Sequence, residues 1–158
     1  MLVLGIDPGS TRVGYGLIDS QSLKPIFFGL LEIKAENKNQ KLKKLGESFQ
    51  KLLKKAKPDL IVIEKIFFSN NQKTAIEVAE SRGALKLLVL QKNIKLLEYT
   101  PQEIKIAVTN YGASDKKSVS LMVSKILSLP EIKGPDDISD ALAIAITGAL
   151  RYKMDSIS

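Results

Sequence analysis

The stretch LGIDPGSTRVGYGLID, residues 4–19, indicates how the fold begins and raises the first question about function. Residues 2–6 form an almost entirely apolar run, which is typical of a strand covered on both faces. Asp7 ends that run and is followed at once by Pro8 and Gly9. A buried carboxylate is costly unless something pairs with it, so Asp7 either shapes a turn or holds a cation.

The pattern along the rest of the chain predicts an α/β fold, with a mixed five-stranded sheet and helices on both faces. Further strands are expected at 13–18, 26–33, 60–63 and 94–99, and helices at 39–57, 72–91, 101–108 and 115–129, with a last helix opened by Pro135. No repeat, low-complexity segment or flexible linker interrupts these elements. We therefore expect residues 1–158 to form a single domain.

Composition limits the chemistry available to the chain. It has no cysteine and no histidine, which excludes disulfides, thiolate chemistry, zinc sites of the Cys/His type and an imidazole base. Lys and Arg outnumber Asp and Glu by 24 to 17 in 158 residues, a net charge of +7 that favours nucleic acid or another anionic partner. Catalysis would have to use carboxylates, lysines, hydroxyls or a bound metal.

Nothing at the amino terminus resembles a secretory leader, because the first residues lack a basic segment and a cleavage site. The longest apolar run, 141–150, is about half the length that spans a membrane. We expect a cytoplasmic protein.

Four acids stand at the ends of elements that are expected to be buried. Glu64 follows the apolar run 60–63 as Asp7 follows 2–6, so the two carboxylates share one sheet edge if their strands are neighbours. Asp137 and Asp140 are three residues apart and share one helix face. Asp136 lies four residues before Asp140, so spacing alone does not choose between Asp136 and Asp137.

Each acid also has a structural interpretation: a turn at Asp7, a solvated strand end at Glu64, and a helix cap at Asp136 or Asp137. Clustered carboxylates repel one another, however, and a set of oxygen ligands without His or Cys suits Mg²⁺ or Mn²⁺. Two such ions can hydrolyse a phosphodiester without a histidine.

Four blocks of sequence carry a resemblance to a known family. LGIDPGSTRVGYGLID (4–19), IVIEKIFFSNNQKTAIEVAESRG (61–83), YTPQEIKIAVTNYGASDKKSVSLMV (99–123) and DDISDALAIAI (136–146) resemble, in order, the blocks of RuvC, the bacterial Holliday junction resolvase. The resemblance implies an RNase H-like fold and Mg²⁺-dependent paired nicks in four-way DNA junctions. It also implies a homodimer and a branch-migration complex (RuvA and RuvB) as partner, and we expect the interface on the helix at 72–91.

By position, the resemblance implies a catalytic and metal-binding tetrad of Asp7, Glu64, Asp137 and Asp140. The pattern D-x-x-D-A-L-A selects Asp137 over Asp136. Asp7 would be shared by two Mg²⁺ ions, with Mn²⁺ as a substitute, while Glu64 completes one site and the Asp137/Asp140 pair closes the other.

The resemblance also implies four DNA-binding residues. Lys105 and Lys116 match lysines that contact DNA near the scissile phosphate, and Arg82 matches a backbone contact or an interface residue. Phe67 matches an aromatic that stacks on an unpaired base, although Phe68 beside it leaves the choice of ring open. The chain departs from the family at two positions. Lys65 stands where glutamine is usual, and residues 116–119 read KKSV where Lys-x-Gln-Val is common, so that Ser118 takes the place of the glutamine.

Three other functions are compatible with parts of this pattern. The first is an RNase H-like nuclease that acts on another structured DNA, which the Lys65 departure leaves open. The second is an actin-like ATPase lobe, whose phosphate loop the first block resembles, although no second glycine-rich loop is found. The third is a junction-binding protein without catalytic activity, which the presence of all four acids disfavours.

Overall fold

The computed structural model describes residues 1–65 and 72–155, which form a five-stranded sheet and five helices. The strands are β1 (Leu2–Asp7), β2 (Arg12–Asp19), β3 (Pro25–Glu32), β4 (Leu60–Glu64) and β5 (Lys95–Tyr99). The helices are α1 (Lys38–Ala56), α2 (Gln72–Gln91), α3 (Pro101–Thr109), α4 (Lys116–Ile126) and α5 (Asp136–Asp155). Among these described residues, no helix is long and apolar enough to cross a membrane.

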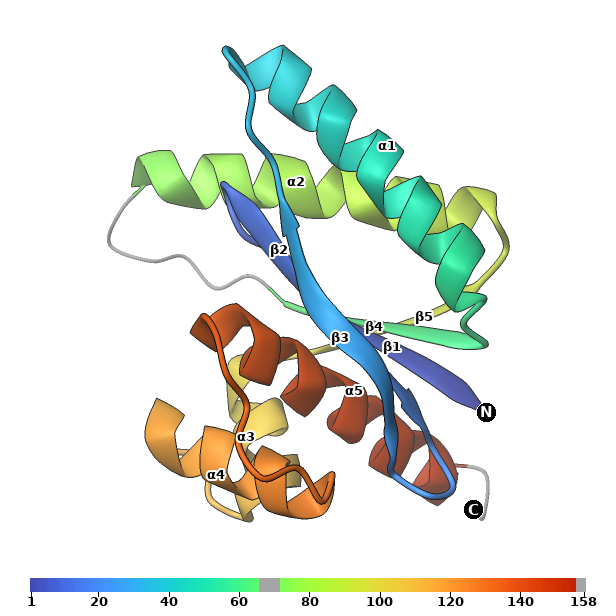
Figure 1. The fold of residues 1–158 in the computed structure, drawn as a ribbon, viewed down its shortest axis with the longest axis vertical. Helices are drawn as coiled ribbons and strands as arrows, with labels where there is room; N and C mark the ends of the chain where they lie inside the picture. Colours follow the sequence, from blue (N-terminus) through green and yellow to red (C-terminus); the bar gives the residue numbers. More distant parts are fainter. Residues whose placement is uncertain (66–71, 156–158) are drawn as a thin grey trace.

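The sheet is mixed, as the sequence predicts. Its order is β3-β2-β1-β4-β5, with β1, β2 and β3 antiparallel and β1, β4 and β5 parallel. Helices α1 and α2 cover one face, and α3, α4 and α5 lie on the other (Figure 1). The predicted elements are confirmed, except that α4 ends at Ile126 rather than at residue 129, because Ser128 adopts a left-handed φ of 53° that ends the helix.

The alternation of side chains along the two central strands decides which groups face α5. Leu4 and Ile6 of β1 pack against α1 and α2, whereas Val3 packs in the core under α5. Because successive strand residues point to opposite faces, Asp7 lies on the same face as Val3. In β4, Leu60 and Val62 belong to the α5 core, which places Glu64 on that face too.

Glycines in β1 and β2 let α5 approach the sheet more closely than any side chain would allow. A Cβ on Gly5 would lie 2.1 Å from the carbonyl oxygen of Ala141, and one on Gly14 would lie 2.0 Å from that of Asp137. A Cβ on Gly16 would lie 2.6 Å from a side-chain methyl group of Leu142. The G-x-G spacing in the first block therefore fixes the position of α5 on the sheet, and with it the acids at its amino end.

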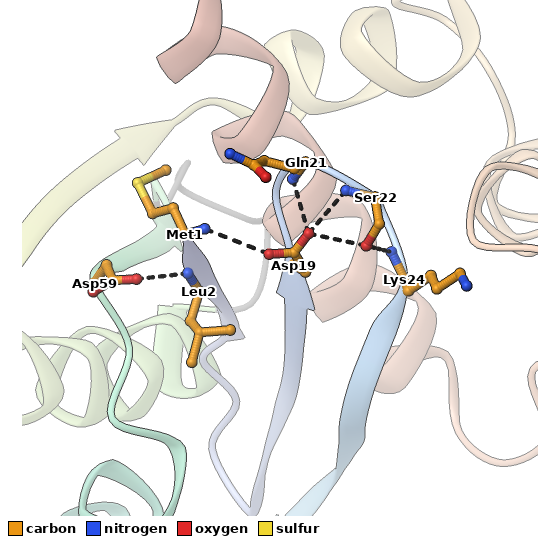
Figure 2. A network of polar contacts seen from close by, with 7 residues as sticks. All are labelled: Met1, Leu2, Asp19, Gln21, Ser22, Lys24 and Asp59. Carbon is orange, nitrogen blue, oxygen red and sulfur yellow. Dashed lines mark hydrogen bonds and ion pairs between the residues drawn. The ribbon is translucent and has the colours of Figure 1, made fainter.

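The acids at the opposite end of the sheet serve the structure instead. Asp19 closes the turn between β2 and β3 by accepting hydrogen bonds from the backbone N–H groups of Gln21 and Ser22 and from the Ser22 hydroxyl (Figure 2). These bonds lower the pKa of Asp19 to about 2. Asp59 similarly accepts the backbone N–H of Leu2 at 2.7 Å. These two carboxylates have donors, so their roles are explained without a ligand.

Candidate active site

Asp7 and Glu64 are placed side by side by neighbouring parallel strands. The register pairs Ile6 with Ile63, so the residues that end β1 and β4 are in line. Both side chains face α5, and both residues are half-buried. The expectation that the two acids share one edge of the sheet is confirmed by this pairing.

The amino-terminal end of α5 brings three more acids to the same edge. The side chain of Asp137 is 18% exposed and that of Asp140 is 33% exposed, whereas Asp136 is 70% exposed. The close approach at Gly14 holds the backbone of Asp137 directly over β2. Exposure therefore separates Asp136 from Asp137, a distinction that spacing in the sequence does not make.

An open cavity of about 480 Å³ joins these groups. Its charged lining consists of Asp7, Arg12, Glu64, Lys105, Lys116, Asp136, Asp137 and Asp140. Lys105 comes from α3, which begins at the Thr100 cap, and Lys116 is the first residue of α4, after the Asp115 cap. The structure thus gathers six residues of the sequence hypothesis, four acids and two lysines, from five separate elements.

The electrostatics of this cavity differ sharply from those at Asp19. Burial raises the pKa of Asp7 from 3.8 to about 8, and repulsion from Asp140, Glu64 and Asp137 adds to the shift. Burial and repulsion from Asp140 raise the pKa of Glu64 from 4.5 to about 7, although Lys116 and Lys105 oppose the rise. The nearby lysines therefore do not offset the effect of burial on these two carboxylates.

Two basic side chains partly neutralise the acids of α5. The Nε of Arg12 lies 2.8 Å from Asp137, and the Nζ of Lys116 lies 3.6 Å from both Asp136 and Asp140. The attraction of Asp140 raises the pKa of Lys116. Burial still raises the pKa of Asp140 despite the neighbouring lysine. Arg12 is absent from the sequence hypothesis, because only the packing of α5 over β2 brings it to Asp137.

The remaining candidates lie elsewhere. Arg82 is in α2, and its side chain bonds to Glu98 and to the backbone carbonyl of Glu64. Phe67 and Phe68 lie outside the described residues. Within the described part of the chain, no three acidic side chains stand close enough to form a ready-made metal-ligand group.

Comparison with known proteins shows the family. The model of the crossover junction endodeoxyribonuclease RuvC family matches residues 3–148. The chain belongs to the RuvC family. The RuvC of Syntrophomonas wolfei is 43% identical over 159 residues, covering 99% of this chain and 92% of the relative. That of Fusobacterium nucleatum is 44% identical over 150 residues, covering 93% and 79%.

Solved RuvC structures share the fold. Thermus thermophilus RuvC superposes with a TM-score of 0.88 at 28% identity, covering 98% of this chain and 97% of the other. The same protein in complex with a Holliday junction substrate gives 0.87 at 27% identity, covering 98% and 96%. The RNase H-like α/β fold implied by the sequence resemblance is thereby confirmed.

Proposed function

We propose that this chain is a Holliday junction resolvase, an endonuclease that makes paired, symmetric nicks in four-way DNA junctions during recombination and repair. The observation that carries the proposal is the cavity itself, where half-buried Asp7 and Glu64 meet Asp137, Asp140 and two lysines. Membership of the RuvC family and the likeness to a RuvC bound to a junction support the choice of substrate.

The donor set fits divalent metal ions. All candidate ligands are carboxylates, the type that Mg²⁺ prefers. Burial, together with repulsion between the acids, raises the pKa values of Asp7 and Glu64, and a bound cation would offset both effects. We assign two Mg²⁺ ions, with Mn²⁺ as a substitute, to Asp7, Glu64, Asp137 and Asp140. Bound ions would supply an activated water and stabilisation of the leaving oxygen.

The chain's own residues then bind and orient the DNA strand. Lys105 of α3 and Lys116 of α4 line the same cavity as the acids, where their charges can hold the phosphate group of the strand to be cut. Arg12 and Lys116 also hold Asp137 and Asp140 in ion pairs. These pairs keep the α5 carboxylates oriented and reduce their mutual repulsion.

Adjacent acids in α5 provide a sharp test. Asp137→Asn is expected to lower junction cleavage more than about a hundredfold, because a ligand is lost, whereas Asp136→Asn keeps cleavage within about threefold, since its carboxylate faces solvent. The assay uses a synthetic four-way junction labelled on each strand in turn, with Mg²⁺ or EDTA. Paired nicks that need Mg²⁺ and Asp137 support a resolvase. Cuts confined to other branched substrates would show a related nuclease, and equal losses in both variants would refute the choice of Asp137.

Two symmetric nicks need two active sites related by a two-fold axis, so we propose a homodimer. The face of α2 away from the sheet suits a second copy of this chain. Ile76, Leu87 and Leu90 are each more than half exposed there. Together with Ala79 and Gly83, these residues form a stripe along α2 whose members are three, four, four and three residues apart. A Cβ on Gly83 would meet nothing within 4 Å, so a helix of the second copy could approach closely.

Charge placed on this stripe is expected to separate the dimer. The double variant Leu87→Lys, Leu90→Lys should sediment as a monomer and make few paired nicks, because like charges would meet across the axis. The control is Ile26→Lys on β3, which is 52% exposed but lies outside the stripe, and it should remain a dimer. A double variant that stays dimeric would place the interface elsewhere.

Three further assignments complete the proposal. Residues 1–158 act as a single nuclease domain, since all the gathered groups depend on one sheet. The protein works in the cytoplasm, where its DNA substrate arises. A branch-migration complex of RuvA and RuvB delivers the junction, as the family resemblance implies.

A further inference from the structure

We infer that Arg82 is a positioning residue for the active site, which holds the backbone of Glu64 and so orients its carboxylate. The inference rests on the proposed function. It differs from the DNA-binding role that the sequence resemblance implies for Arg82. The deciding observation is that the guanidinium is directed inward, with its side chain only 17% exposed.

The contact to Glu64 is made to its backbone. The Nε of Arg82 donates a hydrogen bond to the carbonyl oxygen of Glu64 at 2.9 Å. Glu64 is the last residue of β4, and on the β5 side the ladder continues one step further, where the N–H of Lys65 donates to Tyr99. In β1, Pro8 follows Asp7 and has no N–H that could extend the ladder past that point. Arg82 of α2 thus supplies a hydrogen-bond donor to the carbonyl group at the end of β4.

The guanidinium is itself held by a second partner. Its terminal nitrogen forms a charged hydrogen bond with Glu98 of β5, and Lys86, one turn further along α2, bonds to the same carboxylate at 2.9 Å. The side chains of Glu98 and Lys86 are 27% and 28% exposed, so these charges are partly shielded from water. The planar guanidinium of an arginine can donate to a carbonyl and to a carboxylate at the same time, which a lysine ammonium cannot do with the same fixed geometry.

The placement of these residues gives Arg82 a specific consequence for chemistry. It lies on the α1–α2 side of the sheet, while the Glu64 side chain faces the cavity on the α5 side. Arg82 therefore acts through the peptide backbone rather than by touching DNA or metal. Losing such support for a ligand typically weakens metal binding or activity about 10- to 100-fold.

The experiment compares Arg82→Gln, Arg82→Lys and the control Lys86→Met in the full chain. Mn²⁺ affinity is measured by electron paramagnetic resonance without DNA, and junction affinity is measured in EDTA. We expect Arg82→Gln to weaken Mn²⁺ binding and kcat about 10- to 100-fold and to leave junction affinity within about twofold. Arg82→Lys should remain impaired in Mn²⁺ binding, because a positive charge alone does not restore the two simultaneous hydrogen bonds of the guanidinium. Lys86→Met, which leaves the Glu64 contact intact, binds Mn²⁺ as the unmodified chain does.

Two outcomes would overturn the inference. Loss of junction affinity with unchanged Mn²⁺ binding would make Arg82 a DNA contact, and a lowered melting temperature with unchanged Mn²⁺ binding would make it a purely structural residue. The Mn²⁺ measurement needs no cleavage. Failure of the unmodified chain to cut junctions would therefore count against the proposed function and leave the positioning role to be decided by Mn²⁺ affinity.

Discussion

The substitution Asp7→Asn is expected to abolish junction cleavage and at the same time to stabilise the metal-free protein. Cleavage should fall by more than about a hundredfold, beyond the loss seen when only a supporting partner of a ligand is removed. Stability should rise because the folded chain holds Asp7 in a half-buried site among other acids, which raises its pKa to about 8. The amide of asparagine has the same shape and carries no charge, so it does not repel the neighbouring acids.

The sign of the stability change follows from proton linkage. A carboxyl whose pKa rises from 3.8 to about 8 on folding binds its proton more tightly in the folded state, so stability falls as pH rises between these values. At pH 7.5, just below the raised pKa, folding must protonate a carboxyl that is ionised in the unfolded chain, which costs on the order of 5 kcal/mol at about 1.4 kcal/mol per pKa unit. For a chain of this length, that corresponds to a rise on the order of 10 °C in Tm for Asp7→Asn.

Calorimetry in EDTA checks this result, with Asp19→Asn as the matched control. Asp19 lies at the opposite end of the same sheet, and its hydrogen bonds lower its pKa to about 2, so the same substitution there should reduce stability (Figure 2). Opposite shifts of Tm in the two variants would show that Asp7 is a carboxylate suited to a ligand, whereas Asp19 stabilises a turn. A fall in Tm for Asp7→Asn would show that Asp7 is satisfied within the fold itself.

The fold was predictable because local signals agreed with one another. Apolar runs ended at Asp7 and Glu64, and period-2 alternation then placed both carboxylates on the α5 face. The helices expected at 101–108 and 115–129 begin, in the structure, directly after caps formed by Thr100 and Asp115. These local signals point to Asp7, Glu64 and Asp140, whereas the choice of Asp137 over Asp136 and of the two lysines came from the resemblance to RuvC.

Contacts between distant elements were not predictable in the same way. Arg12 meets Asp137 only because Gly14 allows α5 to lie against β2, and glycine spacing alone does not reveal what will approach it. The role of Arg82 is similar, since its bonds to Glu64 and Glu98 depend on how α2 crosses the sheet. Packing creates these pairs, and a single sequence carries no local pattern for them.

The second large effect is expected in the pH dependence of metal binding. Metal can bind only to ionised carboxylates, so it must displace protons from Asp7, with a pKa of about 8, and from Glu64, with a pKa of about 7. Lowering the pH from 8 to 6 protonates both groups. Each pH unit below the pKa of a carboxyl makes the proton about ten times harder for the metal to displace. The Mg²⁺ concentration for half-maximal cleavage should therefore rise about 10²- to 10³-fold.

The measurement is a Mg²⁺ titration of junction cleavage at pH 6, 7 and 8, paired with the Tm shift that Mg²⁺ produces at each pH. The chain contains no histidine, the side chain that ordinarily titrates over this range, so junction affinity in EDTA serves as an internal control. Lys116→Met should move the midpoint further upward, since Lys116 holds down the pKa of Glu64. A midpoint that does not change with pH would mean that Asp7 and Glu64 are already ionised in the metal-free protein. The negative charge of the cavity would then be neutralised by Arg12 and the lysines alone.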